Sequence, residues 1–410
     1  MSARDEKLPH IHEISDEEGL RTETMTVNFG PQHPATHGTL RIELEVDGEV
    51  IVRAEPEIGF LHTGFEKLGE YLDYNQFVCV TDRMNYISPL NNNIGFAIAV
   101  EKLFGIEVPK RGQYVRVIMA ELSRIFDHLL SIGTQALDLG AFTVFLYFFQ
   151  EREKLYDLFE MVTGTRLTTS YTRLGGVIRD FPDEFYPAVQ KFIEELPGVI
   201  REVEILLNRN KIFLGRTKDI GVLTPEEAIN YGWTGPCLRS TGVSWDIRKA
   251  EPYSSYEDFE FDIPVGGNGD VYDRYLVRME EMHQSLRIVQ QALENLPEGD
   301  VCLFDWKVHI PEKEDVYHTI EGLIHHFEIF MKNRGFRTPV GEVYSCTEAP
   351  NGELGFYIVS DGSRSPYRVR VRPPSFVNYQ PFSDVMRGKM LSDIVAMLGS
   401  LNIIAGELDR

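Results

Sequence analysis

Apolar and polar residues alternate along two segments near the N-terminus, 22–27 and 39–46, which is the period-two pattern of half-buried β-strands. A third segment, Glu49–Ala54, predicts a further strand. The connecting segment Asn28–Gly38 contains two prolines and two glycines. Because proline lacks a backbone donor and glycine frees the backbone, this segment is neither helix nor central strand. We therefore predict a shaped loop presented between two strands.

The helical period of 3.6 residues dominates the remainder of the chain. It predicts helices over 91–104, 113–139, 146–162, 183–207, 279–293, 314–333 and 392–401, with a helix start at Thr224. Short strands are predicted at 341–344, 355–362 and 367–371, the first two joined through 348–352, and the long irregular stretch 233–256 is typical of a functional or interface loop. The fold class is α+β, mainly α.

This pattern divides the chain into three parts. Residues 1–20 are charged and predict a mobile N-terminal arm. Residues 21–65 form a β-rich segment that carries the shaped loop, and residues 66–410 form a helical core with short strands at about 341–372. We expect the N-terminal strands to be antiparallel and the core to be a large helical bundle.

The helix predicted over Gln113–Leu139 carries a polar stripe. The stripe advances in alternating steps of three and four and consists of Glu121, Arg124, His128, Ser131, Gln135 and Asp138. Such a stripe ordinarily faces solvent, but apolar residues cover so much of the remaining circumference that we expect this helix inside the bundle. Asp138 would then face a cavity or a partner, and a histidine is a natural partner for a buried carboxylate.

His33 and His37 are four residues apart within the shaped loop. On a helix this spacing would place two imidazoles on one metal ion, but Pro34 excludes that geometry. The pattern leaves two interpretations open, a functional loop and a structural turn whose histidines satisfy backbone carbonyls. Arg83 and Tyr86 are three residues apart and point roughly the same way on a helical turn, although an arginine there is ordinarily a surface charge.

Composition narrows the function classes. The 410 residues include 63 acids and 41 bases, and the net charge of −22 argues against nucleic-acid binding and against binding to anionic lipids. The four cysteines, at 79, 237, 302 and 346, form no C-x-x-C pair, so we expect no metal site in this chain and a reducing compartment. The longest nearly apolar run, Leu139–Phe149, is too short to cross a bilayer, and no apolar signal core precedes it.

Five longer motifs carry a family resemblance. They are Gly30–Gly38, Ile58–Lys67, Asp82–Tyr86, Gly235–Lys249 and Ser375–Asn378. Together they closely resemble the 49 kDa-type subunit of respiratory complex I, the D subunit of bacterial NADH-quinone oxidoreductase, from about residue 20 to the C-terminus. That family is related to the large subunit of nickel-iron hydrogenases, so the resemblance implies a hydrogenase large-subunit-like fold.

The kinship with hydrogenases appears in Glu348–Gly355, which is similar to the hydrogenase motif E-A-P-R-G-x-L-G. Hydrogenases hold their metal with four thiolates, in an R-x-C-x-x-C near the front and a D-P-C-x-x-C near the end. The corresponding segments here, Arg83–Ser88 and Asn402–Glu407, contain no cysteine. Because thiolates hold such metals, we predict no metal in this chain.

The resemblance implies that the vacated metal cavity is a quinone site. His37 and Tyr86 would hydrogen-bond the two quinone carbonyls, Asp138 would pair with His37 and raise its pKa, and His33 belongs to the same quinone-binding set. Electrons would come from a 4Fe-4S cluster in the adjacent subunit, beside which Arg83 supplies positive charge. The implied partners are the terminal-cluster subunit, the thirty-kilodalton-type subunit and the quinone-channel membrane subunit, at the cytoplasmic side of the bacterial inner membrane.

One position departs from the family. A histidine often lies beside the partner's cluster, in an arginine-x-histidine setting, whereas this chain reads Arg166-Leu-Thr168. Threonine cannot become cationic, so we expect a lower cluster potential with weak pH dependence, which would suit menaquinone. Two alternatives to the quinone-site prediction are a non-catalytic scaffold subunit and the large subunit of a related ferredoxin- or other-donor-linked membrane oxidoreductase.

Overall fold

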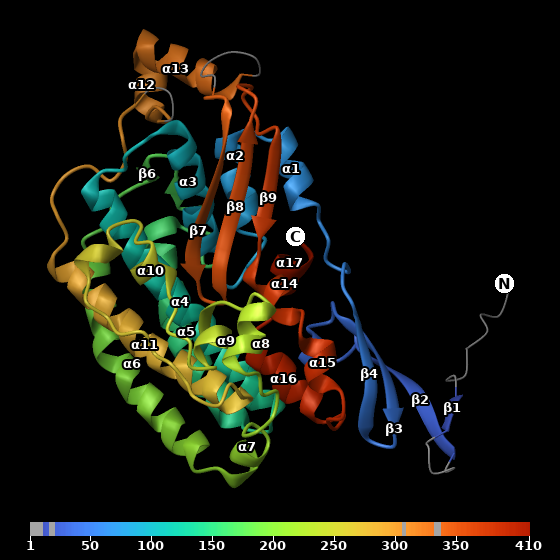
Figure 1. The fold of residues 1–410 in the computed structure, drawn as a ribbon. Coiled ribbons are helices and arrows are strands. Elements are labelled where there is room, and N and C mark those ends of the chain that lie inside the picture. Colours follow the sequence, from blue (N-terminus) through green and yellow to red (C-terminus); the bar gives the residue numbers. More distant parts are fainter. Residues whose placement is uncertain (1–10, 16–20, 306–308, 332–337) are drawn as a thin grey trace, which may run out of the picture.

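The structure is a computed structural model that describes residues 11–15, 21–305, 309–331 and 338–410. An antiparallel N-terminal sheet extends from one side of the molecule (Figure 1). Its strands, in spatial order, are β1 (Ile11–Ser15), β2 (Arg21–Phe29), β3 (Arg41–Asp47) and β4 (Val50–Glu57). The predicted alternation is confirmed, since Ile42, Leu44 and Val46 of β3 are buried while their neighbours are not.

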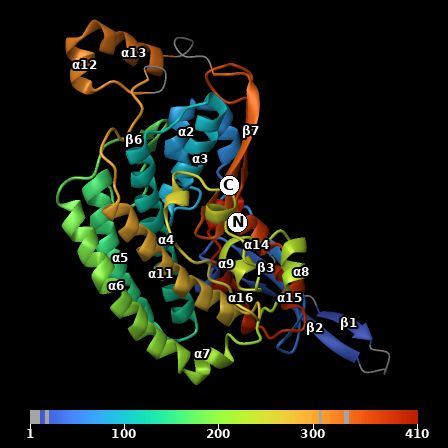
Figure 2. The same ribbon diagram turned by 60° about the vertical axis from the view of Figure 1, so that its left-hand side comes forward.

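The helices form the body beside this sheet (Figures 1 and 2). Helix α4 (Lys110–Asp138) runs through the centre, where α3 (Pro89–Phe104), α5 (Phe142–Thr163), α11 (Val271–Glu294) and α16 (Asp393–Leu401) pack against it. The other helices of the body are α1 (Phe65–Tyr71), α2 (Tyr74–Thr81), α6 (Phe185–Asn208), α7 (Lys211–Gly215), α8 (Pro225–Asn230), α9 (Gly235–Arg239), α10 (Ile247–Ala250), α14 (Pro374–Tyr379), α15 (Phe382–Met386) and α17 (Ala405–Asp409).

A second antiparallel sheet packs on α3. It consists of β7 (Gly341–Ala349), β8 (Gly352–Ser360) and β9 (Arg368–Arg372), and a two-stranded pair is formed by β5 (Thr172–Arg173) and β6 (Gly176–Val177). The rings of Phe96 on α3 and Phe356 on β8 meet edge to face with centroids 5.5 Å apart. Burial of such aromatic pairs joins sheet and helix into one core.

The mainly helical α+β class is confirmed, and several element boundaries differ from those predicted. The helix expected over 314–333 is two helices, α12 (Lys313–His318) and α13 (Ile320–Phe330), because Thr319 is extended (φ −124°, ψ 147°) and its side chain caps α13 at Gly322. Residues 332 and 333 lie outside the described part. The connection predicted at 348–352 is a turn at 350–351 only, so Glu348 belongs to a strand.

The N-terminal arm predicted at 1–20 falls largely outside the described residues, and its segment Ile11–Ser15 forms an edge strand paired with β2. The three-part domain division stays a prediction. Across the described residues, we find no helix whose length and apolar content would carry it through a bilayer. The same part of the chain brings no three potential metal-ligating side chains together.

Candidate functional site

The loop between β2 and β3 is closed by a short 3-10 turn, η1 (Pro34–Thr36). Gly30 opens it with a φ of 81°, and a Cβ there would lie 2.3 Å from the carbonyl oxygen of Leu40, so only glycine fits. His33 caps the turn, because its Nδ1 accepts a hydrogen bond from the Ala35 N–H at 3.1 Å, and its ring lies 4.2 Å from the Phe29 ring. His33 thus stabilises the turn through a backbone N–H rather than a carbonyl, and its place in the quinone-binding set stays a prediction.

His37 ends the same turn in the left-handed conformation, with φ at 53°. Its backbone N–H donates to the Pro34 carbonyl at 3.1 Å, and the residue as a whole is exposed to solvent. Burial by the surrounding protein nevertheless lowers the pKa of His37 and favours the neutral ring. The imidazole of His37 therefore remains accessible to a ligand.

Asp138 ends helix α4 and is half-buried. Burial raises the pKa of its carboxyl, and the charge of His33 partly lowers it again. In the chain alone, the histidine that acts on Asp138 is therefore His33. The predicted pairing of Asp138 with His37 would raise the pKa of His37, whereas burial lowers it here. The Asp138–His37 pair stays a prediction, which concerns the assembled site.

Tyr86 lies in the turn that follows α2, and this turn contacts the C-terminal segment. A Cβ added to Gly406 would lie 2.6 Å from the Met84 carbonyl oxygen and 2.7 Å from that of Arg83. Burial raises the pKa of the Tyr86 phenol, while a hydrogen bond with the backbone of Ala405 opposes that shift. The phenol is consequently protonated at neutral pH, and the Arg83 side chain is exposed beside it.

We expect Gly406→Ala to destabilise the chain by about 1–3 kcal/mol, because the added methyl group overpacks against two backbone carbonyls that cannot move freely. The matched control is Gly198→Ala in α6, where a Cβ would meet nothing within 4 Å and where alanine favours the helix. Urea unfolding measures both. Equal midpoints for the two variants would contradict the close contact.

The same C-terminal region borders the other candidate residues. Helix α16 packs against both α4 and η1, and a Cβ on Gly399 of α16 would lie 3.2 Å from the Gln135 side chain, one turn before Asp138. The fold thus brings the histidine loop, the end of α4 and the Tyr86 turn to one C-terminal segment, 393–409. These are the segments in which sequence reasoning placed its candidates.

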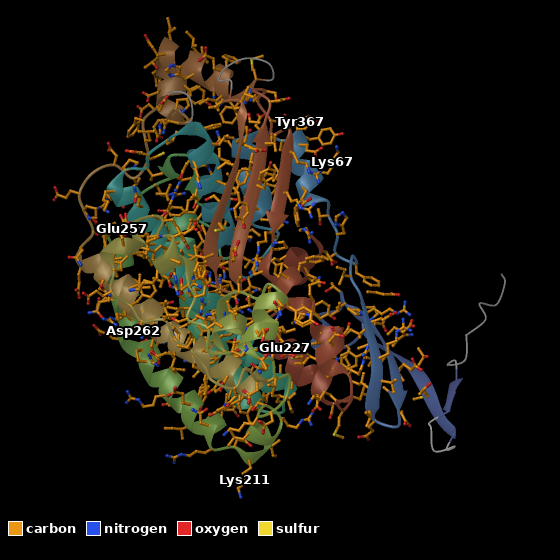
Figure 3. All side chains as sticks on the ribbon, in the orientation of Figure 1. Lys67, Lys211, Glu227, Glu257, Asp262 and Tyr367 are labelled. Atoms are coloured by element: carbon orange, nitrogen blue, oxygen red, sulfur yellow. The ribbon has the colours of Figure 1, made fainter. Side chains whose placement is uncertain are left out.

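Deeper in the molecule, the polar stripe of α4 is buried. Glu121, Arg124 and His128 have no exposed surface, in contrast to outward-pointing charges such as Lys211 and Glu257 (Figure 3). The solvent-facing interpretation of the stripe is wrong, and the expectation that α4 lies inside the bundle is confirmed. Buried charges require partners, and the stripe finds them in other elements.

Three arginines and four carboxylates form this buried network. Arg239 of α9 contacts Glu281 (Nη2 to Oε1, 2.6 Å) and Glu348 (Nη1 to Oε1, 2.8 Å). His128 Nε2 lies 2.8 Å from Glu281 Oε2. The remaining members join through the following pairs, Arg248–Asp246 at 2.6 Å, Arg248–Glu121 at 3.0 Å and Arg124–Glu121 at 3.2 Å. The network ties α4, α9, α10, α11 and β7 together.

The charges in the network set one another's ionisation. Burial alone would raise the pKa of Glu121, but Arg124 and Arg248 lower it to about 2. Burial likewise opposes the charge of Glu281, yet Arg239 and His128 hold its pKa well below the usual range. Both carboxylates are therefore ionised at neutral pH, whereas burial raises the pKa of Glu348 against the opposing charge of Arg239.

Sequence reasoning missed most of this network. Arg239, Asp246, Arg248 and Glu348 all lie in the motifs Gly235–Lys249 and Glu348–Gly355, which carried the family resemblance without a role for each residue. The signal in the sequence was the charge of these four residues, because two arginines and two acids could pair with the charged stripe of α4. Helical periodicity gave no means of pairing them across the chain.

Comparison with known proteins decides the family. The family model described as the respiratory-chain NADH dehydrogenase 49 Kd subunit matches residues 138–410. The NADH-quinone oxidoreductase D subunit of Geotalea uraniireducens is 52% identical over 389 residues, which cover 95% of this chain and 99% of that protein. The chain belongs to this subunit family. It is a component of an NADH:quinone oxidoreductase complex.

Two further relatives extend the comparison. The NADH-quinone oxidoreductase D subunit of Myxococcus xanthus is 49% identical, over 98% of this chain and 96% of that protein. The NADH-quinone oxidoreductase C/D subunit of Bdellovibrio bacteriovorus is 53% identical over 95% of this chain, but the match covers 70% of its own length. That relative therefore carries additional sequence beyond the part shared with this chain.

The departure at Thr168 lies in an unusual backbone conformation. Thr168 is half-buried with a φ of 55°, a left-handed value that is uncommon for a β-branched residue. The nearby Arg166 contacts acids of α5, Asp157 at 3.2 Å and Glu160 at 3.8 Å. The Arg166 charge is thus paired within the chain, and the effect of Thr168 on a partner's cluster stays a prediction.

Proposed function

We propose that this chain forms the quinone-reduction site of a proton-pumping NADH-quinone oxidoreductase. The observation that carries the proposal is the contact between the Arg83–Tyr86 turn and Ala405–Gly406. These are the two segments that hold metal thiolates in the related hydrogenases. Here they carry a protonated phenol instead of cysteines, which suits hydrogen bonding to a carbonyl acceptor.

His37 and Tyr86 bind and protonate the quinone in this proposal. Quinone reduction consumes two electrons and two protons, and an imidazole and a phenol are suitable donors. In the charged form that Asp138 favours, the His37 ring donates a proton and becomes neutral, and desolvation keeps the Tyr86 proton in place until transfer. Asp138 stabilises the charged imidazole.

Electrons arrive from a 4Fe-4S cluster held by the neighbouring subunit, beside Arg83. With Thr168 in place of a histidine, the cluster potential is low and responds weakly to pH, which suits menaquinone as the substrate. A redox titration of the cluster in the complex, performed between pH 6 and pH 8, tests this part. A clearly pH-dependent potential would contradict it.

The partners follow from the same proposal. The terminal-cluster subunit and the quinone-channel membrane subunit cover the site, and the chain is peripheral on the cytoplasmic side of the bacterial inner membrane. A thirty-kilodalton-type subunit is a further partner. The name of the Bdellovibrio relative joins the letters C and D in one protein, which supports close association of this chain with a C-type subunit.

The test is NADH:quinone reductase activity of the purified complex carrying Tyr86→Phe or His37→Ala. Removal of one proton donor is expected to lower quinone reduction at least about a hundredfold. NADH:ferricyanide activity is the control for upstream electron flow and is expected to be unchanged. If both variants reduced quinone at the normal rate, the chain would be a scaffold subunit, and replacing NADH by reduced ferredoxin would then test the other-donor alternative.

A further inference from the structure

Among the described residues, buried polar atoms without hydrogen-bond partners follow the inner face of α4 up to Asp138. Asp127, Ser131 and Gln135 advance in steps of four toward Asp138, and none of these three is more than 2% exposed. Within the described part of the chain, Asp127 Oδ2, Ser131 Oγ and both polar atoms of the Gln135 amide lack a hydrogen-bond partner. A folded protein leaves few buried polar groups in this state.

Arg278 of α11 adds a buried cation to this face. It has no exposed surface, and its Nε, Nη1 and Nη2 atoms have no hydrogen-bond partner among the described residues. Its charge acts on Asp127 and on His128, so it lies close to α4. An interior guanidinium must be solvated by something smaller than a side chain, and water is the group that fits.

Two buried carboxylates are connected at the inner end of this face. Asn402 Nδ2 donates to Asp127 Oδ1 at 2.6 Å and to Asn351 Oδ1 at 2.5 Å. Asn351 Nδ2 in turn lies 3.5 Å from Glu407 Oε2, which also accepts a hydrogen bond from Ser375. Asp127 and Glu407 are thus joined through two amide side chains.

Both carboxylates hold protons more tightly than usual. Burial raises the pKa of Asp127, and burial together with the charge of Asp127 raises that of Glu407 to about 7. The charged groups that act on Asp127 are His128 of α4, Arg278 of α11 and Arg152 of α5, and the charge that acts on Glu407 is that of Asp127. Glu407 therefore exchanges its proton near neutral pH, and it belongs to the same short helix as Ala405 beside Tyr86.

We infer that water molecules held by Asp127, Ser131, Gln135 and Arg278 form a file that supplies protons from Glu407 to Asp138 at the quinone site. This inference rests on the proposed function, because the file delivers protons to a reaction only if Asp138 belongs to the quinone site. Helices α4, α11 and α16 enclose the file, and all three pack against one another (Figures 1 and 2).

The proton that reaches the quinone through His37 is replaced by a proton from Glu407. Electrons from the neighbouring subunit's iron-sulfur cluster reduce the quinone, and a lone pair of its oxygen then takes a proton from the charged His37, whose N–H bond breaks to leave the neutral ring. One proton then passes along the waters to Asp138 and from Asp138 to His37, which restores the charged ring, breaks the Glu407 O–H bond and leaves a carboxylate. Solvent protonates Glu407 again. Arg278 stabilises the negative charge on Asp127 while the file is one proton short.

The first experiment interrupts the file in the intact complex with Gln135→Met, which keeps the side-chain length and removes both polar atoms. Quinone reduction at pH 8 is expected to fall roughly tenfold or more, with a larger solvent deuterium isotope effect and unchanged NADH:ferricyanide activity. Ser131→Ala, a smaller change, should act in the same direction. The matched control is Thr134→Val, whose hydroxyl bonds only the helix backbone at Leu130 and Ser131, and it should leave the rate and the isotope effect unchanged.

The second experiment identifies the donor. In the natural complex, the rate of quinone reduction should change with pH near pH 7. This change should disappear in Glu407→Gln and return in Glu407→Asp. If Gln135→Met and Glu407→Gln keep the normal rate, pH profile and isotope effect while Tyr86→Phe is inactive, the file is wrong and the quinone site stands. If Tyr86→Phe and His37→Ala both reduce quinone at the normal rate, the quinone-site proposal itself fails.

Discussion

Replacing Arg239 by methionine is expected to destabilise the protein by about 3–5 kcal/mol, the cost of breaking a buried charge pair from one side. Arg239 has no exposed surface and contacts Glu281 at 2.6 Å and Glu348 at 2.8 Å. Methionine fills a similar volume but leaves both carboxylates without their cation. The charges of Glu281, Glu348 and Asp246 raise the pKa of Arg239 against the opposing effect of burial, so the cation is strongly held in the folded state.

The matched control for this variant is Arg287→Met on α11. Arg287 is 45% exposed, and its acidic neighbours, Glu260 at 3.8 Å and Asp262 at 3.1 Å, are mostly solvated. Exposed pairs contribute at most about 1 kcal/mol. Urea unfolding should therefore separate the two variants clearly. Similar midpoints would mean that water enters the network and that its charges are not desolvated.

The second large effect is a change in the pH dependence of stability in Glu407→Gln. Glu407 has its pKa raised to about 7 in the folded chain, chiefly by burial, against an ordinary value of 4.5. Between these values the folded state keeps a proton that the unfolded state has lost, so the free energy of unfolding decreases as pH rises. Below pH 4.5 this penalty is absent, and above pH 7 it is complete.

Glutamine does not titrate, so the variant escapes the penalty. Relative to the natural chain, Glu407→Gln should gain up to about 3 kcal/mol in the free energy of unfolding between pH 4.5 and pH 8, since each pKa unit corresponds to about 1.4 kcal/mol. Unfolding curves of both proteins at four pH values measure the difference. Glu226→Gln, at an exposed position on α8, is the control and should give a difference independent of pH. A pH-independent difference for Glu407→Gln as well would place this carboxyl in contact with solvent.

Local sequence pattern was sufficient for most elements, for identifiable reasons. The alternation at 39–46 specified β3 because one face of that strand is buried and the other is not. Thr224 with Pro225 specified the start of α8, where the threonine side chain accepts from the Glu227 N–H. The pattern failed at Thr319, where a side-chain cap divides one apolar stretch into two helices.

The candidate site was predictable in part. Its segments were found because proline, glycine and histidine concentrate in one loop and because long motifs carried the resemblance. The structure assigns His33 a capping role and makes it the histidine that acts on Asp138, neither of which spacing along the chain reveals. It also places Ala405 and Gly406, at the far end of the sequence, against the Tyr86 turn, a contact that the kinship with hydrogenases implied.

The sequence by itself determined the family, the fold class and the absence of cysteine from the segments Arg83–Ser88 and Asn402–Glu407, because each depends on residue identity or local period. Only the tertiary structure decided which face of α4 is buried and which charges satisfy it. The sequence pattern of the stripe from Glu121 to Asp138 is the same whether the stripe faces water or protein. The ionisation of its side chains depends on partners such as Arg239 and Arg278. These arginines lie in elements far along the chain, and only the packing of those elements sets their distances from α4.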